Sequence, residues 1–233
     1  MRTISDKPTF ISKFHKTYSG AVIAFLLFLL HWRITNNNDP RMFSETFGAS
    51  ASAILRGEWY RCVTALFLHG SDMHLAGNMA GIIIFGTSVC SITGSGVGWF
   101  LILISGFMGN YCNALFYKSI HLSIGASTAV FGSIGILAGY RFIYSLEESG
   151  LRITAFIPVG AGLGLLALLG ASPESDVMAH LFGFFIGMIA GALYRLFIRK
   201  PAAERTQVIF LSCATAISLL CWVRGNYLNL MAS

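Results

Sequence analysis

Seven long apolar runs constrain the fold of this chain more than any other feature. They lie at about 18–32, 75–93, 98–117, 127–145, 152–170, 177–198 and 207–223. A helix that crosses the hydrocarbon core of a bilayer needs about 20 largely apolar residues. Only 11% of the residues are charged, against about 25% in average soluble domains. We therefore expect an all-α, polytopic membrane protein.

Two of these runs are less regular than the others. The first, SGAVIAFLLFLLHW, follows Lys13 and Lys16 with about ten strongly apolar residues, which is also the pattern of a signal peptide. No small-x-small cleavage pattern follows it, so a retained membrane anchor is favoured. The fifth run contains Pro158, which membrane helices tolerate when neighbours satisfy the freed carbonyl. Whether this run crosses the bilayer fully stays open here.

The distribution of Lys and Arg predicts the orientation, because cytoplasmic segments carry an excess of these residues. With the N-terminus inside, ten lie in inner segments: Arg2, Lys7, Lys13, Lys16, Arg141, Arg152, Arg195, Arg199, Lys200 and Arg205. Six lie in outer segments: Arg33, Arg41, Arg56, Arg61, Lys118 and Arg224. We expect a cytoplasmic N-terminal tail (1–17), a core of six membrane helices (18–200) and a seventh helix with a tail (201–233).

Composition also excludes several classes of function. The net charge is +6, yet no basic patch is interleaved with stacking aromatic residues, so nucleic acid is not an expected partner. The five cysteines form no CxxC pair, and most lie in apolar runs, which indicates neither a disulfide framework nor a thiolate metal site. His69 and His74 with Asp72 form a poor metal-ligand set, because the histidines are five positions apart, a spacing that does not place them on one helix face. We expect no metal and no cofactor.

Polar side chains with catalytic potential lie at the starts of three apolar runs. His74 and Asn78 lie at the start of the second run, Ser127 at the start of the fourth and His180 near the start of the sixth. If every run crosses the membrane, these three starts face the same side. The four side chains then lie at similar depth below the outer surface. Polar groups inside a membrane are costly, and they mark functional sites by default.

Helical spacing suggests how these side chains approach one another. His74 and Asn78 are four residues apart and share a helix face. The small residues Ala179, Gly183, Gly187 and Gly191 recur every four residues in the sixth run, a pattern that lets membrane helices pack closely. Packing this stripe on the small residues of the fourth run would bring His180 toward Ser127. A serine hydroxyl becomes a nucleophile when a hydrogen-bonded base takes its proton.

Other interpretations of the same residues remain open from spacing alone. A serine in a membrane helix most often bonds a backbone carbonyl one turn back. A glycine stripe also occurs in transporters, although the runs here lack the Asp, Glu, Lys or Arg that mark ion pathways, except for Arg141, Arg152 and Arg195 near their inner ends. His15, His31 and His121 have no partner at suitable spacing, and we interpret them as non-catalytic.

Three motifs in sequence order resemble those of the rhomboid intramembrane serine proteases. EWYRCVTALFLHGSDMHLAGNM is similar to the first-loop aromatic-Arg element followed by His-x4-His-x3-Asn, GASTAVFG to the G-x-S-G serine motif, and AHLFGFFIG to the A-H-x2-G-x3-G histidine motif. The resemblance covers roughly residues 55–195. It implies a rhomboid-like core of six helices, and the seventh helix is similar to the longer topology found in part of the family.

The resemblance also implies a role for each matching residue. Ser127 would be the nucleophile and His180 the general base, in a dyad that needs no acid. His74, Asn78 and the backbone N–H of Ser127 would stabilise the oxyanion. The supporting positions would be Gly125 in the turn, Phe131 against the histidine ring, Gly183 and Gly187 in the packing stripe, and His69 and Arg61 as structural residues. One position departs from the pattern, since Thr128 follows the serine where the family usually has glycine.

The expected activity is therefore cleavage of single-span membrane proteins near the outer membrane face. The alternative within the same family is an inactive protein that binds membrane clients without cutting them. The expected location is the bilayer of a bacterial inner membrane, with the N-terminus in the cytoplasm. The sequence makes no prediction of oligomeric state.

Overall fold

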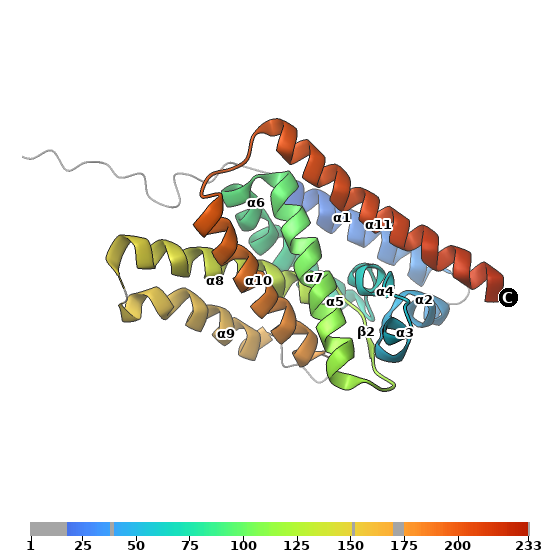
Figure 1. Cartoon of the computed structure of the whole chain (residues 1–233). Helices are drawn as coiled ribbons and strands as arrows, with labels where there is room; N and C mark the ends of the chain where they lie inside the picture. Colours follow the sequence, from blue (N-terminus) through green and yellow to red (C-terminus); the bar gives the residue numbers. More distant parts are fainter. Residues whose placement is uncertain (1–17, 38–39, 151, 170–174, 233) are drawn as a thin grey trace, which may run out of the picture.

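Helices form most of the described part of the chain (Figure 1). The computed structural model describes residues 18–37, 40–150, 152–169 and 175–232. The expected cytoplasmic tail at 1–17 lies outside these residues. The helical segments that match the seven runs are α1 (Ser19–Thr35), α5–η3–α6 (Asp72–Gly81, Ile82–Gly86, Thr87–Thr93), α7 (Ser95–Tyr117), α8 (Ser127–Ser149), η4–α9 (Ile153–Phe156, Ile157–Leu169), α10 (Val177–Phe197) and α11 (Glu204–Ala232).

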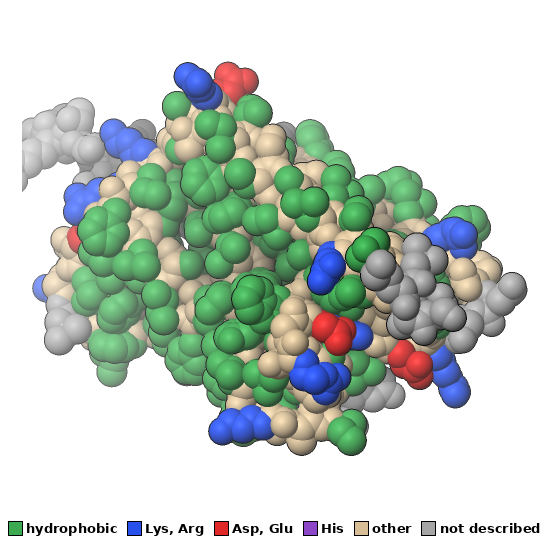
Figure 2. Space-filling view, turned by 45° about the vertical axis from the view of Figure 1, so that its right-hand side comes forward, with side chains coloured by type: hydrophobic (Ala, Val, Ile, Leu, Met, Phe, Trp, Pro, Cys, Tyr) green, Lys and Arg blue, Asp and Glu red, His purple; other side chains and the backbone are tan. Residues whose placement is uncertain are grey.

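Five of the described helices are long and apolar enough to cross a membrane. They are Asp72–Thr93, Ser95–Tyr117, Ser127–Glu148, Val177–Phe197 and Glu204–Leu228. The first and fifth runs form shorter apolar helices, Ser19–Thr35 and Ile153–Leu168. Large apolar side chains also point outward, among them Leu26, Ile189 and Leu220, each more than half exposed. Figure 2 shows a face on which hydrophobic side chains predominate and charged side chains are few. The prediction of an all-α polytopic membrane protein is confirmed.

Helices α8 and α10 lie side by side and run parallel (Figure 1). A Cβ atom added to Gly183, Gly187 or Gly191 would lie 2.0–2.3 Å from the carbonyl oxygen of Thr128, Gly132 or Ile136, respectively. Each of these pairs is separated by 55 residues, so the register is constant along the contact. The backbones touch because glycine leaves no side chain between them. Because α8 and α10 point in the same direction, the chain must return from the end of α8 to the start of α10. Helix α9 lies in this return segment, which corresponds to the fifth apolar run.

The described part of the first loop (residues 36–37 and 40–71) is folded rather than extended. It contains the short helices α2 (Pro40–Phe47), α3 (Ala51–Leu55), α4 (Arg61–Thr64) and η2 (Ala65–Phe67), together with the two-residue strand β1 (Ala49–Ser50). Strand β1 pairs antiparallel with β2 (Leu122–Ser123), in the loop between α7 and α8. The buried side chains of this loop pack partly on α7, through Phe107 and Tyr111. This pairing fixes the loop that leads into Ser127.

Arg61 holds the first loop together from inside. Its Nε donates to Glu58 Oε2 across 2.6 Å, and its Nη1 donates to the carbonyl oxygens of Glu45 and Gly48. Burial alone would raise the pKa of Glu58, but the hydrogen bond and positive charge of Arg61 outweigh it and leave that pKa below the ordinary value. The surroundings of Arg61 are thus those of a structural residue.

Candidate active site

Ser127 and His180 meet at the parallel starts of α8 and α10. Ser127 is the first residue of α8, and His180 lies in the first turn of α10. His180 Nε2 lies 2.6 Å from Ser127 Oγ, although 53 residues separate them in the sequence. This is hydrogen-bond distance for a hydroxyl and an imidazole nitrogen. The pair therefore has the geometry in which an imidazole can take the proton of a serine.

Phe131 packs against the histidine from the same helix as Ser127. The rings of Phe131 and His180 are stacked, with centroids 4.7 Å apart and planes inclined by 30°. Both side chains are buried, at 4% exposure each. Phe131 lies four residues after Ser127 and so projects from the same face of α8. The stacking restricts rotation of the imidazole and keeps its Nε2 directed at the serine.

The turn before Ser127 needs glycine for two separate reasons. Gly125 has φ +130°, a backbone conformation that residues with a side chain rarely adopt. A Cβ atom at this position would also lie 2.7 Å from both Cε1 and Nε2 of His74 and 3.4 Å from Ser127 Oγ. The imidazole of His74 and the hydroxyl of Ser127 thus both border the Gly125 backbone.

His74 and Asn78 reach this region from the first turns of α5. Ser71 caps the helix, because its hydroxyl accepts a hydrogen bond from the His74 N–H across 3.2 Å. Asn78 follows one turn later and is 5% exposed. Its Nδ2 is buried without a hydrogen-bond partner among the residues that the structure describes. Such a buried donor is costly at rest, and it can bind an acceptor brought by a substrate.

His69 supports the serine turn from the first loop. Its Nε2 accepts a hydrogen bond from the Ala126 N–H across 3.4 Å, and the adjacent Gly125 N–H donates to the Ala65 carbonyl. Burial, with the nearby His74 and His31, lowers the pKa of His69 to about 3. A neutral imidazole is required here, because only an unprotonated nitrogen can accept from a backbone N–H.

The structure accommodates Thr128, the residue that departs from the glycine pattern. Thr128 is 2% exposed, and its Oγ1 donates to Asn110 Oδ1 of α7 across 3.1 Å. Asn110 Nδ2 in turn donates to the carbonyl oxygen of Cys62 in the first loop. The threonine methyl faces Gly109 and Gly183, where side chains would collide with it. Two glycines on neighbouring helices thus make room for the larger residue.

Comparison with known proteins identifies the family of this chain. The family model of the rhomboid domain matches residues 56–197, which contain Ser127, His180 and the residues that contact them. The chain belongs to the rhomboid family. Membership places it among the intramembrane proteases and membrane proteins of related fold.

Several curated rhomboid proteins share this similarity. RHOMBOID-like protein 4 of Arabidopsis thaliana is 34% identical over 79% of this chain and 49% of its own length. Rhomboid protease GluP of Bacillus subtilis is 29% identical over 93% of this chain and 41% of its own length. Putative rhomboid protease YdcA of the same organism is 26% identical over 65% of this chain and 75% of its length. The chain spans about half the length of the first two relatives.

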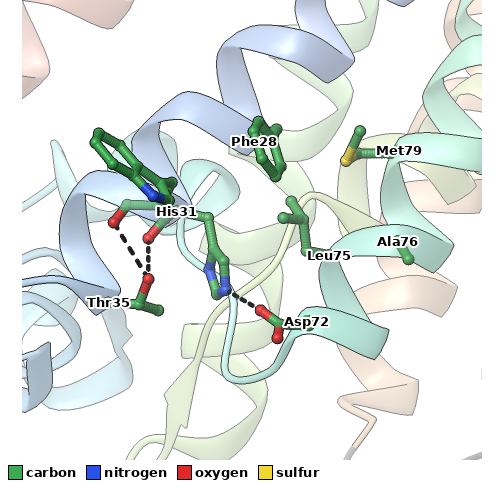
Figure 3. A pocket seen from close by; sticks show the side chains of 8 residues that line it. Phe28, His31, Thr35, Asp72, Leu75, Ala76 and Met79 are labelled. Atoms are coloured by element: carbon green, nitrogen blue, oxygen red, sulfur yellow. Dashed lines mark hydrogen bonds and ion pairs between the residues drawn. The ribbon is translucent and has the colours of Figure 1, made fainter.

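His31 and His121 have no carboxylate partner at helical spacing in the sequence, but each contacts a carboxylate in the folded protein. His31 Nε2 lies 3.0 Å from Asp72 Oδ1, at the edge of a pocket of about 430 Å³ between α1 and α5 (Figure 3). His121 Nε2 lies 2.6 Å from Asp176 Oδ2. Neither partner lies at helical spacing, because the partners are 41 and 55 positions away in the sequence. Of the two carboxylates, only Asp176 could have been singled out from the sequence, because an aspartate directly before an apolar run is a typical helix N-cap.

Proposed function

We propose that this protein is an active intramembrane serine endopeptidase in which Ser127 and His180 form the catalytic dyad. The observation that carries the proposal is the 2.6 Å approach of His180 Nε2 to Ser127 Oγ at the buried ends of two parallel helices. Neutral His180 accepts the hydroxyl proton at Nε2 as Ser127 Oγ attacks the carbonyl carbon of the scissile peptide bond. The protonated imidazole then gives this proton to the leaving amine, which departs and leaves an acyl-serine.

The negative oxygen of the tetrahedral intermediate needs donors already in place. Asn78 Nδ2, the imidazole of His74 and the N–H of Ser127 are the proposed donors. The buried Nδ2 of Asn78 supports this role, and the first N–H groups of an α-helix have no partners within the helix. The N-terminal end of a helix also favours negative charge. Removal of one such donor typically costs about 10²–10³ in rate.

Water completes the reaction in a second step. His180 Nε2 takes a proton from water as the water oxygen attacks the acyl carbonyl, and the proton then passes to Ser127 Oγ as the ester bond breaks. Phe131 and Gly125 act by position, since the first holds the imidazole ring and the second allows His74 to lie beside the serine. Gly183 and Gly187 contribute by allowing α10 to contact α8.

The proposed substrates are single-span membrane proteins. The dyad lies at the ends of membrane helices, where a transmembrane segment meets the outer surface. A peptide bond within a helix is shielded from attack, so substrates should carry small residues at the cleavage site and helix-weakening residues beyond it.

The proposed orientation places the N-terminus in the cytoplasm and the active site near the outer face. The basic residues where α10 ends and α11 begins support it, because Arg195, Arg199, Lys200 and Arg205 lie at the opposite end of α10 from His180. Arg195 and Arg199 both pair there with Glu147 at the end of α8. Positive charges of this kind favour the cytoplasmic side. The proposed location is a bacterial inner membrane.

Reconstituted cleavage tests the proposal. The purified protein is placed in liposomes with a transmembrane substrate that has a weakened helix and a fluorescent tag. Wild-type protein should cleave it, whereas Ser127→Ala and His180→Ala should each abolish cleavage without loss of fold. Cleavage that survives either change would exclude the dyad. Substrate binding without cleavage by the wild type would instead favour a client-binding protein.

A further inference from the structure

The start of α10 is held by a polar cluster that includes none of the reacting groups. Asp176 is the N-cap of α10, and its Oδ1 accepts a hydrogen bond from the Ala179 N–H across 3.1 Å. The backbone carbonyl of Asp176 accepts the N–H of His180 at the same distance. The first turn of the helix that carries His180 is therefore bonded to Asp176 through both its side chain and its backbone.

The second carboxylate oxygen of Asp176 bonds to two other segments of the chain. Asp176 Oδ2 accepts from Asn113 Nδ2, near the end of α7, across 2.6 Å. It also lies 2.6 Å from Nε2 of His121, in the loop between α7 and α8. The Asp176 side chain is only 10% exposed. Charge-assisted hydrogen bonds of this length, shielded from water, are among the stronger polar contacts in proteins.

His121 is itself fixed on two sides. Its ring stacks on Tyr117 with centroids 3.7 Å apart, and its carbonyl oxygen accepts from the Ala51 N–H of the first loop. Burial by itself raises the pKa of Asp176. The hydrogen bonds from His121 and the Ala179 N–H lower it by more than burial raises it, so its pKa lies below the ordinary value. An ionised carboxylate can accept all three hydrogen bonds at once.

The cluster thus joins the two segments that carry the proposed dyad. His121 lies six residues before Ser127, in the loop that leads into it, and Asp176 lies one helical turn before His180. Without this connection, the start of α10 would depend on the glycine contacts farther along the helix. We propose that Asp176 is a positioning residue, whose carboxylate fixes the start of α10 against His121 and Asn113 so that His180 stays within hydrogen-bond distance of Ser127. This inference rests on the proposed proteolytic function.

One substitution at Asp176 distinguishes its role as the N-cap of α10 from its contacts with His121 and Asn113. Asp176→Ser keeps a good N-cap, but the shorter side chain cannot reach His121 or Asn113. A misplacement of about 1 Å at a catalytic group can cost up to 10²-fold in rate. We expect kcat to fall at least tenfold with KM within twofold of wild type. Labelling of Ser127 by a fluorophosphonate should slow in parallel, because this reaction needs the dyad and no substrate.

Two further changes distinguish the hydrogen bond from simple packing. His121→Phe keeps a ring on Tyr117 and loses the donor, whereas His121→Gln keeps a donor and loses the ring. The proposal expects the Gln variant to retain more activity than the Phe variant. Glu147→Gln is the matched control, because it weakens a carboxylate contact between the far ends of the same two helices. It should leave kcat unchanged.

Hydrogen–deuterium exchange provides a readout that does not depend on proteolysis. In Asp176→Ser, amides in residues 177–183 should exchange faster than in wild type, and in Glu147→Gln they should not. Unchanged exchange, wild-type kcat, or a loss confined to KM would overturn the positioning role. If exchange is faster in Asp176→Ser but the wild-type protein is inactive, Asp176 still fixes the start of α10, and the proposed proteolytic function is wrong.

Discussion

Thr128 Oγ1 donates a hydrogen bond to Asn110 Oδ1, so the residue after the proposed nucleophile ties α8 to α7. The family pattern has glycine at this position, and the threonine methyl lies in the space left by Gly109 and Gly183. The departure from the pattern is thus matched by polar and small residues on two neighbouring helices.

The first prediction concerns the energetic value of this contact. Thr128→Val keeps the shape but removes the hydroxyl, which leaves the buried Asn110 Oδ1 without its donor at a cost of about 1–3 kcal/mol. Thermal unfolding in detergent should show reduced stability. The rate of Ser127 labelling per folded molecule should stay within about twofold of wild type. A variant more stable than wild type would contradict the structural account of Thr128.

The second prediction concerns Asn78. Because its Nδ2 has no partner among the described residues, Asn78→Ala removes no hydrogen bond of that group in the resting protein. Stability should change little, whereas kcat should fall by about 10²–10³ if Asn78 stabilises the oxyanion. Cleavage assays and thermal unfolding of the same preparation measure both effects. An unaltered kcat would assign Asn78 to structure alone.

The third prediction compares two glycines with positive φ. Gly125→Ala and Gly57→Ala both place a side chain on strained backbone, at φ +130° and +104°, which costs about 1–3 kcal/mol each. Only the Gly125 variant also presses on His74, since nothing lies within 4 Å of a Cβ atom at Gly57. Gly125→Ala should abolish cleavage, and Gly57→Ala should retain it. Equal activity in the two variants would show that contact with His74 is unimportant.

The fourth prediction concerns pH and stability. The pKa of His69 is about 3 in the folded protein and about 6.5 in an unfolded chain. Above pH 6.5 neither state binds a proton at this residue, so it gives no pH dependence. Between pH 6.5 and 3 the unfolded state binds the proton and the folded state does not, so the free energy of unfolding decreases as pH falls.

Substitution isolates this contribution from other groups that titrate in the same range. His69→Gln is neutral at every pH and retains an acceptor for the Ala126 N–H. Its free energy of unfolding, measured with denaturant from pH 7 to 4, should fall less steeply than that of wild type. The difference in slope should be at most about 1.4 kcal/mol per pH unit. Identical slopes would show that His69 is not held neutral.

The sequence predicted the membrane helices because each leaves a continuous apolar run. It also indicated that Ser127 and His180 approach each other, since the small-residue stripe determines which face of α10 contacts α8. Two features of the observed helices were not predicted from the apolar runs. The π-helical turn at Ile82–Gly86 lies within an unbroken apolar run, and α9 is shorter than the run that predicted it.

Contacts between loops were beyond the reach of local patterns. The pairing of Ala49 with Ser123 joins two-residue strands that have no periodicity to detect. The connection of His121 to Asp176 depends on how three helix ends come together. Such contacts follow from the tertiary arrangement and have no characteristic spacing, so a single sequence does not reveal them.

The reaction of Ser127 with a fluorophosphonate tests the central claim most directly. Folded wild-type protein in detergent is treated with the probe, and the adduct is located by mass spectrometry. The account predicts a covalent adduct on Ser127 in wild type, in Glu147→Gln and in Gly57→Ala, and none in His180→Ala. Absence of an adduct on Ser127 in folded wild-type protein, or its full persistence in His180→Ala, would contradict a nucleophile activated by His180.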